Sequence, residues 1–440
     1  MSEDWNPGIS YAARTDIGMR RTNNQDSHAT IPAKSQERFL QRGHLFIVAD
    51  GMGAHAAGEL ASRMATDHIA MNYFRLGQDD SAQALLEAIH TSNAEIYQRG
   101  QKNPEFYNMG TTASSLAIVP DGAIVGHVGD SRVYRLRKGV FEQLTFDHSL
   151  VWEMHASGQV HPDSALGQAI PKNVITRSLG PNADVNVDIE GPFKVEPGDQ
   201  FLLCSDGLSG QVDDVEIATL VDCLPEALAV QVLVDLANLR GGPDNTTVVI
   251  VRADEGITQS NSAVSKPKPV DRNQNIMVAS FAACIVLTLA AIAFWSQTMP
   301  GAMVLCLLGT LITLGIGITA LSNRQKSYPS RNGAGHHASQ SIAPQPFGGK
   351  APYRRYQSAP NNELFAKLGS TVKELKDVAT TKNWLMDWGH IDQLQAQGAD
   401  AMKSGDGRTA IRLQAEAIVE TMQQLREQHN RAADETAIDH

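Results

Sequence analysis

The sequence is poor in cysteine and in aromatic residues. Four of its 440 residues are cysteines, and Phe, Trp and Tyr together make up 6%. No two cysteines form a Cys-x-x-Cys pair, and two lie in apolar runs, so the pattern excludes a disulfide framework. We expect reduced, packing thiols in a cytosolic or membrane setting. The cysteines are Cys204, Cys223, Cys284 and Cys306.

An excess of basic charge is also missing. The chain has 37 Lys and Arg against 48 Asp and Glu, which gives a net charge of -11. A general nucleic-acid binder carries a basic footprint, so we expect no nucleic acid among the partners. Residues 1–10 contain acids, Trp5 and a Pro-Gly pair but no apolar run, so we expect no secretory signal peptide.

Charged residues are absent altogether from Ile276 to Asn323. Two apolar stretches in this segment, Ile276–Trp295 and Ala302–Leu321, are each long enough to cross a hydrocarbon core of about 30 Å. Two buried helices of a soluble core are the alternative. Lys and Arg flank the pair on both outer sides and are absent from the connecting turn, which favours cytoplasmic termini. The sequence therefore predicts a two-helix transmembrane hairpin over 276–323, in a multi-pass membrane protein.

One stretch that is present stands out, Asp50-Gly51-Met52-Gly53-Ala54-His55. It follows the apolar run Leu45–Ala49, which predicts a buried strand, and the glycines allow a tight turn. A carboxylate and a backbone carbonyl then lie at the strand end. Oxygen ligands of this kind suit Mg²⁺ or Mn²⁺. The alternative is an ordinary Asp-Gly turn.

Four more acids recur in similar surroundings, each at the edge of a predicted strand beside Gly, Ser or Asn. Such edges gather at one end of a layered sheet, and clustered carboxylates repel one another unless cations neutralise them. Each acid alone can be a turn residue or cap, but together they favour a multi-metal site. The four are Asp26, Asp130, Asp206 and Asp244.

Residues 1–253 are expected to form one globular unit. Ala113–Val119 and Ala123–Val128 flank a Pro-Asp-Gly turn and predict a β-hairpin. Apolar residues at helical spacing mark Gly58–Phe74 and Ala82–Tyr97. Because short strands are grouped apart from helices, we predict an α+β fold with antiparallel sheets.

Three further regions are expected besides the hairpin. Residues 254–275 are rich in Ser, Asn and Pro and predict a flexible linker. Residues 324–362 contain Lys and Arg but no acid, and predict a disordered basic linker that rests on anionic lipid or is a soluble spacer. Residues 363–430 show helical spacing and predict a small all-α region that docks or self-associates.

The order of motifs over residues 9–252 resembles the metal-dependent serine/threonine protein phosphatases of type 2C, in particular bacterial members. That resemblance implies a four-layer α-β-β-α sandwich of two antiparallel sheets between helices. Residues 146–172 are similar in place to the variable flap of the family. The motifs are Thr15–Gly18 with Arg21–Ser27, Asp50–His55, Gly110–Thr112, Gly129–Arg132, Asp147–Ser149, Val174–Gly180, Ser205–Gly207 and Asp244–Asn245.

The resemblance implies a set of metal ligands for two Mn²⁺ or Mg²⁺ ions. Asp50 would bridge the ions, and the Gly51 carbonyl would bind one of them. Asp206 and Asp244 would hold the other ion. Asp26 would bind through water. A third, weaker ion would lie between Asp130 and Asp206.

The resemblance also implies the chemistry. Arg21 would grip the substrate phosphate, for which its planar fork is suited, although a surface ion pair is the alternative. Metal-activated water would attack phosphorus in line, and His55 would protonate the leaving oxygen or be a packing residue. Two departures are Gln25, where many members have Glu, and Ala54, where the motif has Gly.

The implied enzyme hydrolyses phosphoserine and phosphothreonine in proteins and acts against a serine/threonine kinase. Membrane lipid is a further expected partner, since the predicted hairpin would tether the enzyme to the cytoplasmic face. A catalytically silent scaffold that binds phosphoproteins is the alternative. Silent relatives usually lack ligand acids, and this chain retains all five, which favours activity.

Overall fold

The computed structural model describes residues 5–53, 56–75, 80–255, 348–382 and 384–438, with isolated positions between 283 and 313. Residues 159, 162–163, 165–166, 168 and 172–173 are outside this set, as are the side chains after 428. The chain divides into two compact units, 1–261 with 344–440, and 262–343. The predicted hairpin and nearly all of the 254–275 linker lie outside the described residues. No helix within the described ranges is long and apolar enough to span a membrane.

The first sheet has six antiparallel strands in the order β1-β11-β10-β7-β8-β12. Apolar residues lie on both faces of this sheet, because successive side chains of a strand point to opposite faces. Leu202 and Cys204 pack outward against helices, whereas Phe201 and Leu203 face the second sheet. The strands are β1 (Ile9–Asp16), β7 (Arg132–Arg137), β8 (Val140–Gln143), β10 (Gln200–Cys204), β11 (Thr246–Ala253) and β12 (Arg354–Gln357).

The second sheet is also antiparallel, in the order β2-β3-β5-β6-β9, with β4 paired to β3. The predicted hairpin is present: β5 and β6 pair from Ala113 to Val128 around Gly122, whose φ of 138 favours glycine. The strands are β2 (Asp26–Ile31), β3 (His44–Met52), β4 (Gly110–Thr111), β5 (Ala113–Val119), β6 (Gly122–Val128) and β9 (Asp188–Phe193).

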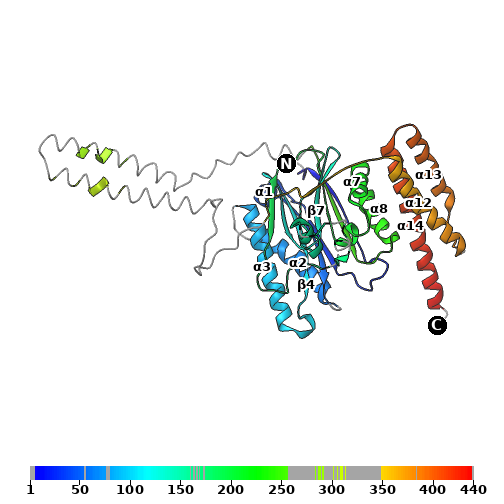
Figure 1. The fold of residues 1–440 in the computed structure, drawn as a ribbon, viewed down its shortest axis with the longest axis horizontal. Helices are drawn as coiled ribbons and strands as arrows, with labels where there is room; N and C mark the ends of the chain where they lie inside the picture. Colours follow the sequence, from blue (N-terminus) through cyan, green and yellow to red (C-terminus); the bar gives the residue numbers. More distant parts are fainter. Residues whose placement is uncertain are drawn as a thin grey trace. The chain divides into compact units, whose positions relative to one another are not determined.

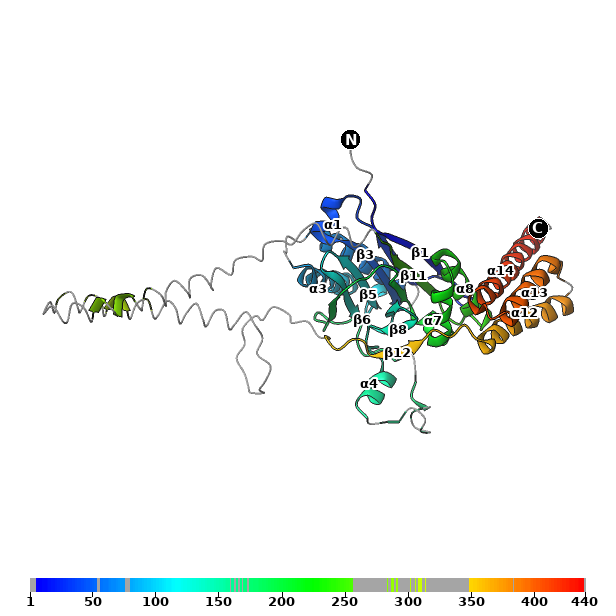
Figure 2. The same ribbon diagram turned by 90° about the horizontal axis from the view of Figure 1, so that it is seen from above.

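Helices cover the outer face of each sheet (Figures 1 and 2). α2 (Ala57–Arg75) and α3 (Ser81–Lys102) share a core with the second sheet, and α7 (Asp214–Cys223) and α8 (Glu226–Leu239) share one with the first. A third core of side chains such as Phe46 fills the space between the sheets. The prediction of an α+β fold with two antiparallel sheets is confirmed.

The region after residue 348 differs from the sequence-based expectation. Residues 354–357, predicted to be part of a disordered linker, form β12 and pair with β8 at the sheet edge. Three helices follow, α12 (Asn362–Thr381), α13 (Trp388–Lys403) and α14 (Gly407–Ile438). The break between α13 and α14 falls at Gly405, whose φ is 85. The last part of the expected linker is therefore ordered, because the exposed edge of β8 supplies hydrogen-bond partners that its sequence alone does not reveal.

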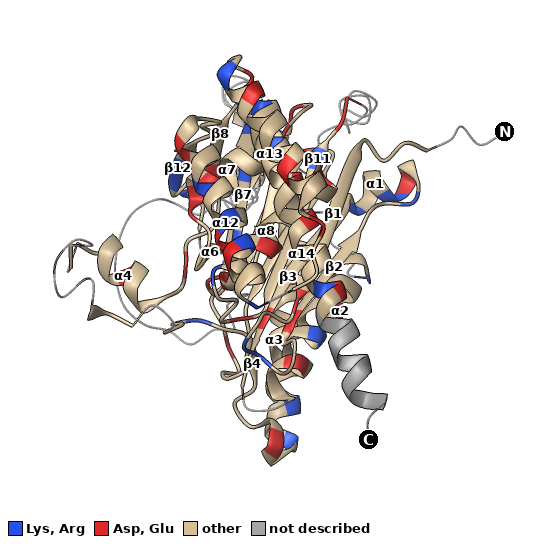
Figure 3. Cartoon of the chain, turned by 90° about the vertical axis from the view of Figure 1, so that its right-hand side faces the viewer, with Lys and Arg blue, Asp and Glu red and all other residues tan. Residues whose placement is uncertain are grey.

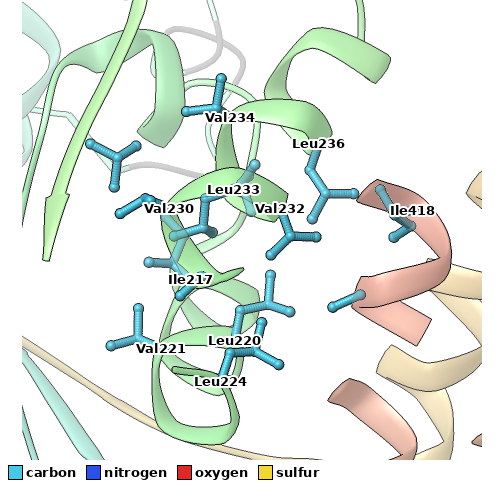
Figure 4. Packing of buried hydrophobic residues seen from close by; sticks show 14 of the residues in the cluster. Ile217, Leu220, Val221, Leu224, Val230, Val232, Leu233, Val234, Leu236 and Ile418 are labelled. Carbon is cyan, nitrogen blue, oxygen red and sulfur yellow. The ribbon is translucent and has the colours of Figure 1, made fainter. Parts of the chain in front are cut away.

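The C-terminal helices bury their apolar faces on the first unit's own helical layer. Leu368, Ile411 and Ile418 belong to the same hydrophobic core as α7 and α8, and Ile418 lies beside Leu236 (Figure 4). Ion pairs surround this core where acidic and basic stretches meet (Figure 3). These pairs join Lys367 to Asp213 and Glu216, Arg408 to Asp222, and Arg426 to the fully buried Asp235.

Candidate metal centre

The structure brings the ends of several strands together at one edge of the sandwich. Asp26 begins β2 and lies directly opposite Asp50 on β3. Asp130 follows β6, Asp206 follows β10, and Asp244 precedes β11. All five acids predicted from the sequence therefore belong to loops or strand ends of the two facing sheets.

Small residues allow these loops to approach one another closely. A Cβ atom on Gly51 would lie 2.1 Å from the Gly58 carbonyl oxygen, and one on Gly207 would lie 1.9 Å from the Asn245 carbonyl oxygen. Neither position accepts a side chain without moving backbone. The loop of Asp206 thus packs directly on the loop that follows Asp244.

The carboxylates influence one another strongly. The pKa of Asp26 is raised to about 7, mainly by burial and further by the charges of Asp206 and Asp244, while hydroxyl hydrogen bonds oppose the shift. Burial likewise raises the pKa of Asp130 to about 8, with Asp206 contributing. Burial, and then the charges of its four acidic neighbours, raise the pKa of Asp50 well above its ordinary value. Such mutual shifts require that the five groups lie close together.

Three of these acids have a buried oxygen without a hydrogen-bond partner, namely Oδ1 of Asp26, Asp130 and Asp206. Unpartnered buried polar atoms are rare in folded proteins and need an explanation. Across the described ranges, Asp244 is the single member of the five that forms an ion pair. The donor type, the excess negative charge and the orphaned oxygens all fit a hard divalent cation.

The acidic side chains are not oriented toward a common metal position. Within the part of the chain that the structure describes, no group of three or more His, Cys, Asp or Glu side chains is arranged to hold a metal ion. Asp244 is directed to Arg21 instead, and Asp26 Oδ2 accepts a hydrogen bond of 2.7 Å from Ser205. The cluster therefore has the chemistry of a metal site, and its ligands have to turn inward to bind an ion.

Arg21 forms a surface ion pair, which was the alternative to phosphate binding in the sequence analysis. Its Nη2 donates to Asp244 Oδ2 at 2.7 Å, and its Nε donates to the Pro243 carbonyl at 3.3 Å. The side chain is 47% exposed. Its predicted contact with substrate phosphate stays a prediction. His55 and Ala54 lie outside the described residues.

Sequence reasoning assigned no role to three polar residues that hold the loops together. Asn245 donates to the carbonyls of Ile17 and Asn23 at 2.8 and 3.0 Å and accepts from the Gln25 amide at 2.8 Å. Ser205 binds Asp26, and Thr112 accepts from the Asp50 amide at 2.8 Å. Each of these residues lies next to, or two residues from, a predicted strand end or acid, and this proximity was the available sequence signal. The sequence does not show which loop each side chain reaches, because that depends on tertiary contacts.

The flap begins beside Asp130. His148 is fully buried, donates its backbone amide to the Gly129 carbonyl at 2.8 Å and accepts from the Gly129 amide at 3.0 Å through Nδ1. Its Nε2 lies 3.1 Å from Asp188. His148 therefore fixes the turn that carries Asp130. The helix α4 (Leu150–Ala156) follows directly.

Two facing antiparallel sheets with clustered acids at their strand ends define a class of metal-dependent hydrolase site. Comparison with known proteins identifies the family. The model of the family described as Protein phosphatase 2C matches residues 19–224. Protein phosphatase PhpP of Streptococcus pneumoniae is 38% identical over 249 residues, which cover 55% of this chain and 96% of that protein. The chain belongs to the protein phosphatase 2C family and is a metal-dependent protein serine/threonine phosphatase.

A solved structure gives the same relationship. The serine/threonine phosphatase of S. agalactiae is 38% identical, with a TM-score of 0.50, and the match covers 56% of this chain and 100% of that one. The catalytic domain of the phosphatase PstP is 32% identical with a TM-score of 0.48 over 56% of this chain and 99% of that one, and was solved with two manganese ions. Less than half of this chain lies beyond these matches.

Proposed function

We propose that the chain hydrolyses phosphoserine and phosphothreonine in proteins at a binuclear Mn²⁺ or Mg²⁺ centre formed by its carboxylate cluster. The observation that carries the proposal is the convergence of five acids, three of which have a buried oxygen without a hydrogen-bond partner. Similarity to PhpP and PstP supports the same activity.

The donor set divides among the ions by position. Asp50, the Gly51 carbonyl, Asp206 and Asp244 would hold the two ions, Asp26 would act through water, and Asp130 with Asp206 would hold a third. When bound, such ions supply an activated water and polarise the phosphoryl group.

The chain's own residues have to rearrange before the reaction. Asp26 and Asp130, whose raised pKa values leave them partly or mostly protonated near neutrality, would lose their protons to solvent when a cation binds. Asp244 has to turn from Arg21 toward the cluster. Arg21 would then be free to donate two hydrogen bonds to the substrate phosphate.

A phosphatase assay on the full chain tests the proposal. We expect hydrolysis of a phosphothreonine peptide with Mn²⁺, and none after EDTA. Asp206→Asn should abolish activity with the fold intact. Asp199→Asn is the control, because it removes a buried carboxylate that pairs with Arg137 away from the cluster. Full activity in Asp206→Asn would refute the metal assignment, and Mn²⁺-dependent phosphopeptide binding without turnover would favour the silent scaffold.

His55 is proposed as the general acid. A general acid matters most for a poor leaving group such as the threonine alkoxide. We therefore expect His55→Gln to slow hydrolysis of phosphothreonine while hydrolysis of p-nitrophenyl phosphate stays unchanged. Equal slowing of both substrates would instead indicate a packing role.

Membrane tethering is proposed from the sequence of residues 276–323, which contain no charged residue. The phosphatase would then act at the cytoplasmic face, with anionic lipid near the basic flanks and a serine/threonine kinase acting in opposition. A reporter fused after His440 should be cytoplasmic in membrane fractions. A reporter on the opposite side of the membrane would overturn this topology.

A further inference from the structure

A short strap, residues 348–357, crosses the edges of both sheets. At its start it meets β9, and at its end it pairs as β12 with β8. Family similarity accounts for residues 19–224, so the strap is an addition to the phosphatase domain. Specific residues of the phosphatase domain bind the strap along its length.

The first contact is a buried carboxylate. Glu190 on β9 is 2% exposed, and its side chain accepts from the Ala351 amide at 3.1 Å and from the Tyr353 hydroxyl at 2.6 Å. It also accepts from the Lys350 amide at 3.4 Å. Burying a carboxylate without hydrogen-bond partners costs free energy. Because the strap supplies the partners of Glu190, these hydrogen bonds stabilise the strap in this position.

The second contact is with the flap. The Arg354 guanidinium lies 3.8 Å from the ring centroid of Trp152 on α4, and Trp152 is 7% exposed. Tyr353 packs edge-on against Phe146, with centroids 5.5 Å apart. Arg354 itself is exposed, so the guanidinium covers a buried ring from the solvent side, and such a cation–π contact is of modest strength. The strap therefore holds both the start of the flap and its helix.

The flap in turn adjoins the carboxylate cluster. Asp147 pairs at 2.6 Å with Arg132, which lies two residues after Asp130. The adjacent His148 is bonded to the turn before Asp130. The two residues before Ser149 and α4 are therefore anchored on the turn that carries Asp130, and α4 lies beside the entrance to the cluster.

We propose that Arg354 is a positioning residue of the phosphatase, which fixes flap helix α4 through Trp152 and so determines how protein substrates reach the carboxylate cluster. The proposal rests on the proposed function. It predicts that the strap affects substrates large enough to touch the flap and spares small phosphate esters.

The neighbouring Arg355 provides a matched control. It lies on the same strand, points to the opposite face and pairs with Glu142 at 2.9 Å, with 66% of its side chain exposed. Replacing either arginine removes one positive charge and one contact from β12. Only Arg354→Ala removes the contact with the flap.

The experiment compares Arg354→Ala, Arg354→Lys and Arg355→Ala in the full chain with Mn²⁺. We expect Arg354→Ala to raise KM for a phosphothreonine protein about fivefold, as loss of one solvent-exposed cation–π contact does. The kcat for p-nitrophenyl phosphate should stay unchanged, Arg354→Lys should recover part of the loss, and Arg355→Ala should resemble wild type. Equal effects of both alanine variants, or equal effects on both substrates, would overturn the proposal.

Hydrogen exchange gives a readout that does not require activity. Amides of residues 150–157 should exchange faster in Arg354→Ala than in Arg355→Ala or wild type. Unchanged exchange would refute the positioning role even if kinetics changed. If wild type hydrolyses neither substrate, the proposed function fails while this exchange comparison still decides the role of Arg354.

Discussion

Asp26→Asn should stabilise the metal-free protein at neutral and alkaline pH. The Asp26 side chain is 8% exposed, and its pKa is raised from 3.8 to about 7. Between these values the folded state binds a proton that the unfolded state releases, so wild type loses stability as pH rises. Asparagine does not titrate, and its amide oxygen can still accept from Ser205.

The magnitude follows from the shift. Each pKa unit corresponds to about 1.4 kcal/mol, so the full shift of about three units amounts to about 4 kcal/mol. Coupling to the neighbouring acids spreads this over the cluster, and we expect a gain of about 2–4 kcal/mol at pH 8. The gain should vanish at pH 3, where the carboxyl is neutral in both states.

Thermal unfolding in EDTA at pH 3, 5, 6.5 and 8 measures this effect. The Tm difference between Asp26→Asn and wild type should grow with pH to about 5 °C or more. Mn²⁺ should then stabilise wild type more than the variant, because the ion compensates the charge that the variant lacks. A variant less stable than wild type at pH 8, or a difference independent of pH, would refute the reasoning.

Four other outcomes are expected. Burial lowers the pKa of His44 from 6.5 to about 4, so its contribution to stability is complete above pH 6.5 and about 3 kcal/mol is lost as pH falls to 4, measurable by chemical denaturation. Arg426→Ala leaves the fully buried Asp235 without its nearest cation and should lower the free energy of unfolding by about 1–3 kcal/mol, more than Arg408→Ala at an exposed pair. Arg21→Ala should weaken competitive inhibition by inorganic phosphate about tenfold or more while Mn²⁺ affinity, measured by calorimetry, does not fall. Chelation of metal should abolish activity and lower Tm at pH 8, and Mn²⁺ should restore both.

Much of the site could be predicted because its signal is local. Each acid follows or precedes an apolar strand beside a small residue, and strand ends of a sandwich meet at one edge. The β5–β6 hairpin was predicted, because strand period and turn chemistry specify it. The pairing of Asp26 with Asp50 was not predicted, because α1 (Gln36–Arg42) separates β2 from β3 and no tight turn joins them.

The strap was not predicted for the opposite reason. Its strand is four residues long, lies in a segment rich in Pro, Ser and Gly, and forms only because β8 leaves an edge open. The apolar faces of α12 and α14 indicated that these helices would be buried, but amphipathicity does not specify the partner. The pairing of Arg21 with Asp244 likewise depends on where two loops far apart in the chain come to lie.

The sequence by itself determined which side chains are available and where the strongly patterned strands and helices lie, because these depend on neighbours within a few residues. Only the tertiary structure decided which of those groups share a site, how far their proton affinities shift, and that the C-terminal segment wraps the phosphatase domain. Burial and charge interaction arise between residues more than two hundred positions apart, such as Arg21 and Asp244, so no local pattern encodes their strength.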